Sequence, residues 1–129
     1  MLFRSSGKLN GVAPDADLVA IKAFDADGQG TYADVIRGLD WLVTHRDAYG
    51  IRVANLSLGK AVEEAAADDP LVQAVEAVWD AGIVVVCSAG NHGTSGNFSI
   101  TSPGNSPKVI TVGSVTDAGT GQEIGRAHV

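Results

Sequence analysis

The chain has 129 residues, with nine Lys or Arg against fifteen Asp or Glu, which gives a net charge of −6. This length suffices for one domain with a core, and the apolar share of 45 % is ordinary for a chain that folds. The acidic balance argues against a nucleic-acid partner, because phosphate binding needs clustered Lys and Arg. The single cysteine, Cys87, excludes an internal disulfide and a cysteine-built metal site.

No stretch of the sequence has the length and apolar character of a membrane span. The first residues also lack the apolar core of a signal peptide. We therefore expect no membrane partner, and the sequence does not indicate where the protein works.

Apolar periodicity alternates between strand and helix patterns along the chain. Residues 18–24 (LVAIKAF) form a short apolar run typical of a strand. Thr31, with Asp34 three positions later, predicts the start of a helix that ends at Gly50. The next strand is expected over residues 52–58 (RVANLSL).

The second half of the pattern repeats the first. Asp69 before Pro70 predicts a helix start, because aspartate is a good cap and proline suits the first helical position, and Gly82 ends this helix. Residues 83–89 (IVVVCSA) are almost continuously apolar, as in a central strand covered on both faces. Residues 108–115 (KVITVGSV) form the last predicted strand. The alternation predicts an α/β fold with three layers, α/β/α, and a mostly parallel sheet of four or more strands.

Ligands of such sheets bind beyond the carboxyl ends of the strands. The polar segments that directly follow predicted strands are residues 25–30, 57–61 and 90–97. A ligand-binding site is therefore expected within these three segments.

The segment from Gly28 to Ala33 fits the dinucleotide pattern G-x-G-x-x-A. Two features argue against a nucleotide site. Asp25 and Asp27 would stand close to the pyrophosphate, and the next strand closes with Asn55-Leu56-Ser57 instead of the acidic residue that holds the ribose. The alternative is that these glycines shape a loop.

Gly90-Asn91 follows the most apolar predicted strand and places a side-chain amide at the ligand edge. Such an amide is a hydrogen-bond donor suited to a developing oxyanion. An isolated asparagine in this setting is also a common turn residue. The surrounding sequence is therefore needed to distinguish an oxyanion donor from a turn residue.

Eight short motifs occur along the chain in one order. They are GVAPDA at 11–16, VAIK at 19–22, GQGTY at 28–32, NLSLG at 55–59, AGIVVV at 81–86, AGNHG at 89–93, SPG at 102–104 and VITVG at 109–113. Their order, spacing and residue types resemble the subtilisin-like serine proteases (subtilases) over about residues 7–117, with residues 118–129 as a divergent tail. The resemblance implies a truncated subtilisin-like fold in which residues 1–129 are a single partial domain.

In that family the substrate lies extended between two backbone segments and pairs with them like a strand. The resemblance assigns one segment to Ser57, Leu58 and Gly59, and the other to Gly28, Gln29 and Gly30, with Tyr32 near the distal subsites. Glycine suits this role because it lets a peptide approach closely.

The resemblance also assigns a wall of the primary specificity pocket to Ala89 and Gly90, and the oxyanion-hole donor to Asn91. Thr101 falls at the base of that pocket, where many subtilisins carry glycine. Ser102-Pro103 resembles the family's cis-proline turn.

The family's catalytic Asp, its H-G-T-H-type His motif and its G-T-S-M-A-type Ser motif are absent from these 129 residues. We therefore expect a subtilisin-like serine endopeptidase by family that is inactive as this chain, because an oxyanion hole needs a nucleophile and a base. The intact parent would act on a peptide or protein substrate, and the family is often secreted. No cofactor and no metal ion are expected.

Two alternatives to an inactive protease segment stay open. One is a binding or self-assembly module, a homo-oligomer formed through exposed sheet edges. The other is a hydrolase with a rebuilt Ser/His site, for which His92 is the histidine at the ligand edge. The nearby hydroxyl candidates are Ser57, Ser88, Thr94, Ser95 and Ser99.

Overall fold

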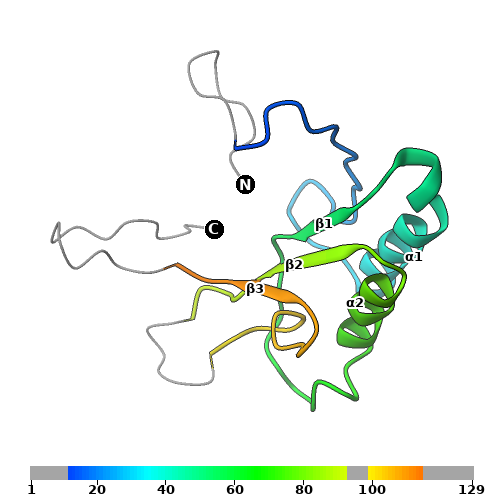
Figure 1. The fold of residues 1–129 in the computed structure, drawn as a ribbon. Helices are drawn as coiled ribbons and strands as arrows, with labels where there is room; N and C mark the ends of the chain where they lie inside the picture. Colours follow the sequence, from blue (N-terminus) through cyan, green and yellow to red (C-terminus); the bar gives the residue numbers. More distant parts are fainter. Residues whose placement is uncertain (1–11, 93–98, 115–129) are drawn as a thin grey trace, which may run out of the picture.

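A computed structural model describes residues 12–92 and 99–114. Its elements follow the order α1 (Tyr32–Tyr49), β1 (Val53–Leu56), α2 (Pro70–Asp80), β2 (Val84–Ser88) and β3 (Ile110–Val112) (Figure 1). The three strands form one parallel sheet in the order β1-β2-β3. The expected α/β class and parallel sheet are confirmed, but the described residues contribute three strands where four or more were expected.

Both helices begin and end where local chemistry predicts. The Thr31 side chain accepts a hydrogen bond from the Asp34 N–H, and the Asp34 carboxylate accepts one from the Thr31 N–H. The predicted capping box is therefore present. Gly50 closes α1 in the left-handed region at φ 62°. Asp69 caps α2 through the Leu71 N–H, with Pro70 at the first helical position. Both predicted helix starts and the end of α1 at Gly50 are confirmed, whereas α2 ends at Asp80 with Ala81 as its cap, just before the predicted Gly82.

Register places alternate side chains of the strands on opposite faces of the sheet. Val53 pairs with Val84 and Leu56 with Cys87, while Val86 pairs with Ile110. Ala54, Leu56, Val85 and Cys87 are buried in one core cluster with residues of both helices, including Leu39 of α1 and Val75 and Val78 of α2.

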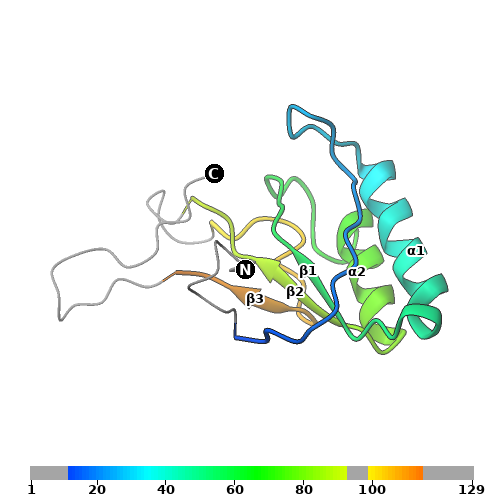
Figure 2. The same ribbon diagram turned by 90° about the horizontal axis from the view of Figure 1, so that it is seen from above.

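Both helices lie on the same side of the sheet (Figures 1 and 2). On the opposite face Val53 is 59 % exposed, Ile110 48 % and Val112 53 %. The described residues therefore show two layers, the sheet and one helical layer, of the three that were expected.

The strand predicted over residues 18–24 is absent. The segment carries no strand assignment, and Leu18 and Ile21 are exposed. A strand requires hydrogen bonds to a neighbouring strand, and among the described residues this backbone has no such partner. Only its end, Ala23 and Phe24, packs against the core. The last strand is also shorter than the predicted range 108–115.

Candidate functional site

The carboxyl ends of β1 and β2 meet at one edge of the sheet because the two strands are parallel. Ser57 and Gly59 follow β1, and Asn91 follows β2 on an exposed bend. The Ser88 hydroxyl at the end of β2 donates a hydrogen bond to the Leu58 carbonyl at 3.3 Å. The structure therefore brings the 57–59 segment and Asn91 to the same edge, as the sequence predicted.

The segment after β1 offers free backbone groups. Among the described residues, the backbone groups of Ser57 and Gly59 have no hydrogen-bond partner. The next residue is held firmly, because the Lys60 N–H donates to the Ser102 carbonyl at 2.9 Å and the Ser102 N–H to the Lys60 carbonyl at 3.0 Å. The unpaired backbone of Ser57 and Gly59 is thus followed directly by Lys60, whose backbone is fixed by two hydrogen bonds.

The loop before α1 is built around the Asp25 carboxylate. Asp25 Oδ1 accepts the N–H groups of Asp27 at 3.0 Å and of Gln29 at 2.8 Å. The Gln29 carbonyl accepts the Asp25 N–H at 2.8 Å. Both backbone groups of Gln29 are therefore used inside the loop, so that this residue cannot offer a full pairing surface to a peptide.

Gly30, in contrast, keeps its backbone free among the described residues. A Cβ atom there would come within 2.7 Å of the Ala23 carbonyl oxygen, so a side chain would force the loop to shift. Gly28 has φ 74°, which suits glycine in the preceding turn.

The same loop argues against a bound nucleotide. A pyrophosphate at such a site needs unoccupied backbone N–H groups. Here the carboxylate of Asp25 already accepts the N–H groups of Asp27 and Gln29. The glycines therefore shape a closed loop.

A small pocket of about 110 Å³ lies between the two predicted substrate segments. Gly30 and Tyr32 line it from one side, and Leu58 and Gly59 from the other. The remaining lining residues are Phe24, Thr31, Val35, Lys60 and Leu71, and of these only Thr31 falls within one of the eight motifs.

Thr101 fills the space between the segments that follow β1 and β2. Its N–H donates to the Ala89 carbonyl at 3.1 Å, and only 6 % of the residue is exposed. A Cβ atom on Gly90 would lie 2.6 Å from Thr101 Cγ2, and one on Gly59 would clash with the threonine hydroxyl. Both positions therefore require glycine while Thr101 is present. The Ser102-Pro103 peptide bond is cis, as the motif predicted.

Lys60 lies within a group of carboxylates. Its Nζ is 3.6 Å from Asp69 Oδ2 and 3.5 Å from Glu64 Oε1. Burial alone would raise the pKa of the Asp69 carboxyl, but the Ser102 side chain, the Leu71 N–H and the Lys60 charge outweigh burial and hold that pKa below its usual value. Asp69 therefore stays ionised and links the segment after β1 to the start of α2.

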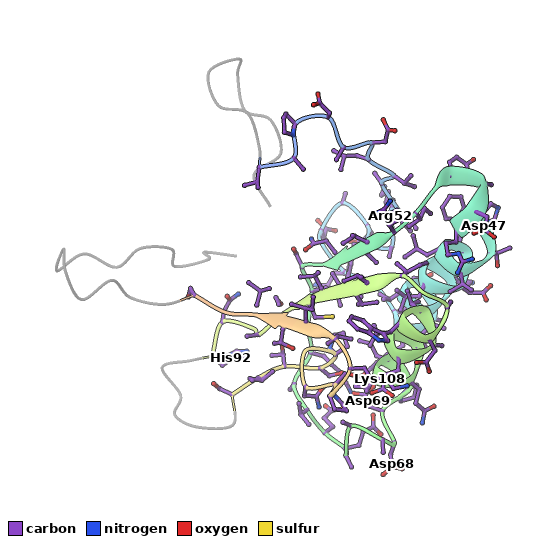
Figure 3. All side chains as sticks on the ribbon, viewed as in Figure 1. Asp47, Arg52, Asp68, Asp69, His92 and Lys108 are labelled. Atoms are coloured by element: carbon purple, nitrogen blue, oxygen red, sulfur yellow. The ribbon has the colours of Figure 1, made fainter. Side chains whose placement is uncertain are left out.

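His92 is exposed on the loop after β2, well apart from Asp69 (Figure 3). Among the described residues it forms no hydrogen bond to a hydroxyl, and the Ser57 hydroxyl instead accepts the Asn55 amide at 3.0 Å. Thr94 and Ser95 lie outside the described residues. The second histidine of this part of the chain, His45, stacks on Trp41 at 4.2 Å between ring centroids. No nucleophile–base pair is therefore formed within the described residues.

The described residues include neither a cluster of metal-ligating side chains nor a membrane-spanning helix. No group of three or more His, Cys, Asp or Glu side chains is placed to hold a metal ion there. Neither described helix combines the length and the apolar character needed to cross a bilayer.

Comparison with known sequences agrees with the motifs. The family model described as "Subtilase family" matches residues 3–125. Serine protease AprX of Bacillus subtilis is 42 % identical over 121 residues, which cover 90 % of this chain and 27 % of that protein. Subtilisin DY of Bacillus licheniformis is 41 % identical, with 81 % of this chain and 36 % of the relative covered. The chain thus spans about a third or less of these relatives.

Solved structures give the same result. Sphericase superposes with a TM-score of 0.69 at 31 % identity, over 85 % of this chain and 35 % of its own. A protein described as S41 psychrophilic protease gives a TM-score of 0.67 at 32 % identity, over 81 % and 32 %.

Proposed function

Because this chain belongs to the subtilase family, we propose that it forms the substrate-binding part of a subtilisin-like serine endopeptidase and does not cleave peptides by itself. The observation that supports this most directly is the shared sheet edge. Free backbone groups of Ser57 and Gly59 and the side chain of Asn91 follow two neighbouring parallel strands there.

In this proposal, an extended substrate pairs with the backbone of Ser57 and Gly59 on one side and of Gly30 on the other. One substrate side chain enters the 110 Å³ pocket that these two segments enclose. A pocket of this size suits a single side chain, since sites for whole small molecules are about 300–1,000 Å³.

Asn91 is the proposed oxyanion donor. Its amide follows β2 and is exposed, so a reacting carbonyl can reach it. A side-chain amide fixed on a scaffold stabilises negative charge that develops in the transition state. Without a nucleophile and base, this stabilisation has no bond-breaking step to act on.

The experiment has two parts. The purified chain is assayed on casein and on chromogenic peptide amides, and no turnover above background is expected. It is then titrated with acetylated hexapeptide amides while backbone amide signals are followed by NMR. Shifts are expected at Gly30, Ser57 and Gly59, and none at Gly82, which lies at the other end of β2. Hydrolysis that is lost in His92→Ala would instead favour a rebuilt site.

A second candidate role is self-association, which the exposed edges and outer face of the sheet favour. Among the described residues the outer edges of β1 and β3 have no strand partner. Val53, Ile110 and Val112 are also about half exposed or more. Such edges accept further strands readily. Sedimentation equilibrium at micromolar concentration tests this, with a dimer or larger species expected and a monomer of 13.2 kDa as the contrary result.

A further inference from the structure

Lys60 and Tyr32 connect the two sides of the candidate site. Tyr32 begins α1 directly after the loop that carries Gly30, and Lys60 directly follows Gly59. The Lys60 Nζ lies 4.8 Å from the centroid of the Tyr32 ring. A cation at this distance over an aromatic face is attracted by the ring quadrupole. The contact therefore bridges the two segments between which the proposed substrate would lie.

This bridge forms part of the pocket wall. Both residues line the 110 Å³ pocket, together with the apolar side chains of Phe24, Val35 and Leu71. The Lys60 side chain is only 22 % exposed, so its carbon stem is packed and does not extend into solvent. The stem therefore limits the space available to any group that enters the pocket.

Lys60 is also held by three carboxylates. Asp69 Oδ2 is completely buried and lies 3.6 Å from Nζ, and Glu63 and Glu64 lie at 3.7 and 3.5 Å. Asp69 is itself fixed, because its Oδ1 accepts the Leu71 N–H at 2.8 Å. The Tyr32 side chain has the largest effect and raises the pKa of Lys60. Desolvation, the next largest effect, lowers this pKa, and the Asp69 charge raises it. The ammonium group is therefore charged, and it contacts both the Tyr32 ring and a buried carboxylate.

We propose that Lys60 is a specificity-determining residue of this site: through its contact with Tyr32 it closes one side of the pocket and restricts it to one compact apolar side chain. This role rests on the proposed peptide-binding function. A branched aliphatic side chain fits among Phe24, Val35 and Leu71, whereas a bicyclic aromatic one has to displace the lysine stem. Displacement breaks the cation–π contact and separates Nζ from Asp69.

The test uses the full chain and two acetylated hexapeptide amides that differ only in one side chain, leucine or 2-naphthylalanine. Affinities come from NMR titration of the Gly30 and Gly59 amide signals. The unmodified chain is expected to prefer the leucine peptide. In Lys60→Ala the preference falls by about two- to five-fold, the range of a cation–π contact of ~0.5–1 kcal/mol. Lys60→Arg, which keeps a cation over the ring, retains the preference.

The matched control is Lys108→Ala. Lys108 also pairs with two carboxylates, Asp80 at 2.8 Å and Glu76 at 3.9 Å, but it does not line the pocket. Its removal leaves the peptide preference unchanged. Equal preference in Lys60→Ala and the unmodified chain overturns the proposal, and so does a loss of preference in Lys60→Arg as large as that in Lys60→Ala.

A measurement without peptide separates this proposal from the proposed function and does not depend on the folding of Lys60→Ala. The Tyr32 ring current shifts the Lys60 ε-methylene protons upfield, and this shift persists in Tyr32→Phe and disappears in Tyr32→Leu. If the shift is present but no peptide binds, the peptide-binding function fails and the specificity role fails with it. If peptides bind and the shift is absent, only the role of Lys60 is overturned.

Discussion

The N–H of Thr101 donates a hydrogen bond to the Ala89 carbonyl at 3.1 Å, which fixes the Thr101 side chain between two glycines. Its hydroxyl oxygen is buried and has no hydrogen-bond partner among the described residues. A buried hydroxyl without a partner costs free energy, and an apolar group of the same shape does not carry this cost.

Thr101→Val is therefore expected to raise the free energy of unfolding by up to about 1 kcal/mol, because valine keeps the shape and removes the unpaired hydroxyl. Thr101→Gly should lower it by about 1–2 kcal/mol through the lost packing and the freer backbone. Urea unfolding followed by tryptophan fluorescence measures both. A valine variant less stable than the parent would show that the hydroxyl has a partner.

Asp69 makes stability depend on pH. Its folded-state pKa lies below the ordinary value of 3.8, so the ionised carboxylate stabilises the fold above that value. This contribution is lost as the pH falls through the folded-state pKa. Asp69→Asn keeps a capping side chain but loses the Lys60 pair, and we expect a loss of about 1–3 kcal/mol at pH 7.

The pH profile separates the charge of Asp69 from its cap. Between pH 5 and pH 3, roughly the range over which such carboxylates titrate, the Asn variant should lose less stability than the parent. Parallel curves would mean that the charge contributes nothing. Urea titrations at each pH provide the measurement.

Cys87 should be unreactive in the folded chain. Only 2 % of the residue is exposed, and burial raises the pKa of its thiol from 9.0 to about 11. At pH 8 this shift alone reduces the thiolate fraction by about 100-fold. Labelling with a chromogenic disulfide is expected to be at least that much slower than in urea. Fast labelling without denaturant would place the thiol at the surface.

In an intact parent protease, Asn91→Ala should lower kcat by about 10²–10³-fold with little change in KM, a magnitude taken from the corresponding asparagine of subtilisin. The matched control is Asn55→Ala, which removes an amide of the same sheet edge that is hydrogen-bonded to Ser57. An equal loss in both variants would indicate a general disturbance of the edge in place of an oxyanion role.

Local chemistry made much of this fold predictable. The Thr31 capping box, Gly50, and Asp69 before Pro70 are short-range signals, and the helices follow them. The position of Asn91 also followed from sequence, because a polar residue after an apolar strand must lie at the carboxyl edge of a parallel sheet.

Non-local contacts were not predictable in the same way. Residues 18–24 have the composition of a strand, but pairing depends on a neighbour that composition does not show. A lysine after a strand is ordinarily solvated, so the position of Lys60 over Tyr32 had no signal in the sequence. The insertion of Thr101 between Gly59 and Gly90 likewise depends on a loop that returns from beyond β2.

Because both helices lie on one face, the sheet residues fall into two groups, of which only one is constrained by packing against the helices. Ala54, Val85 and Cys87 must match the volume of the helices below them, so they can change only together with those helices. Val53, Val84 and Ile110 face away from the helices. Exchanging these outer residues for those of another family member should change which protein surface packs against this face of the sheet, while the unfolding midpoint of the chain stays nearly constant.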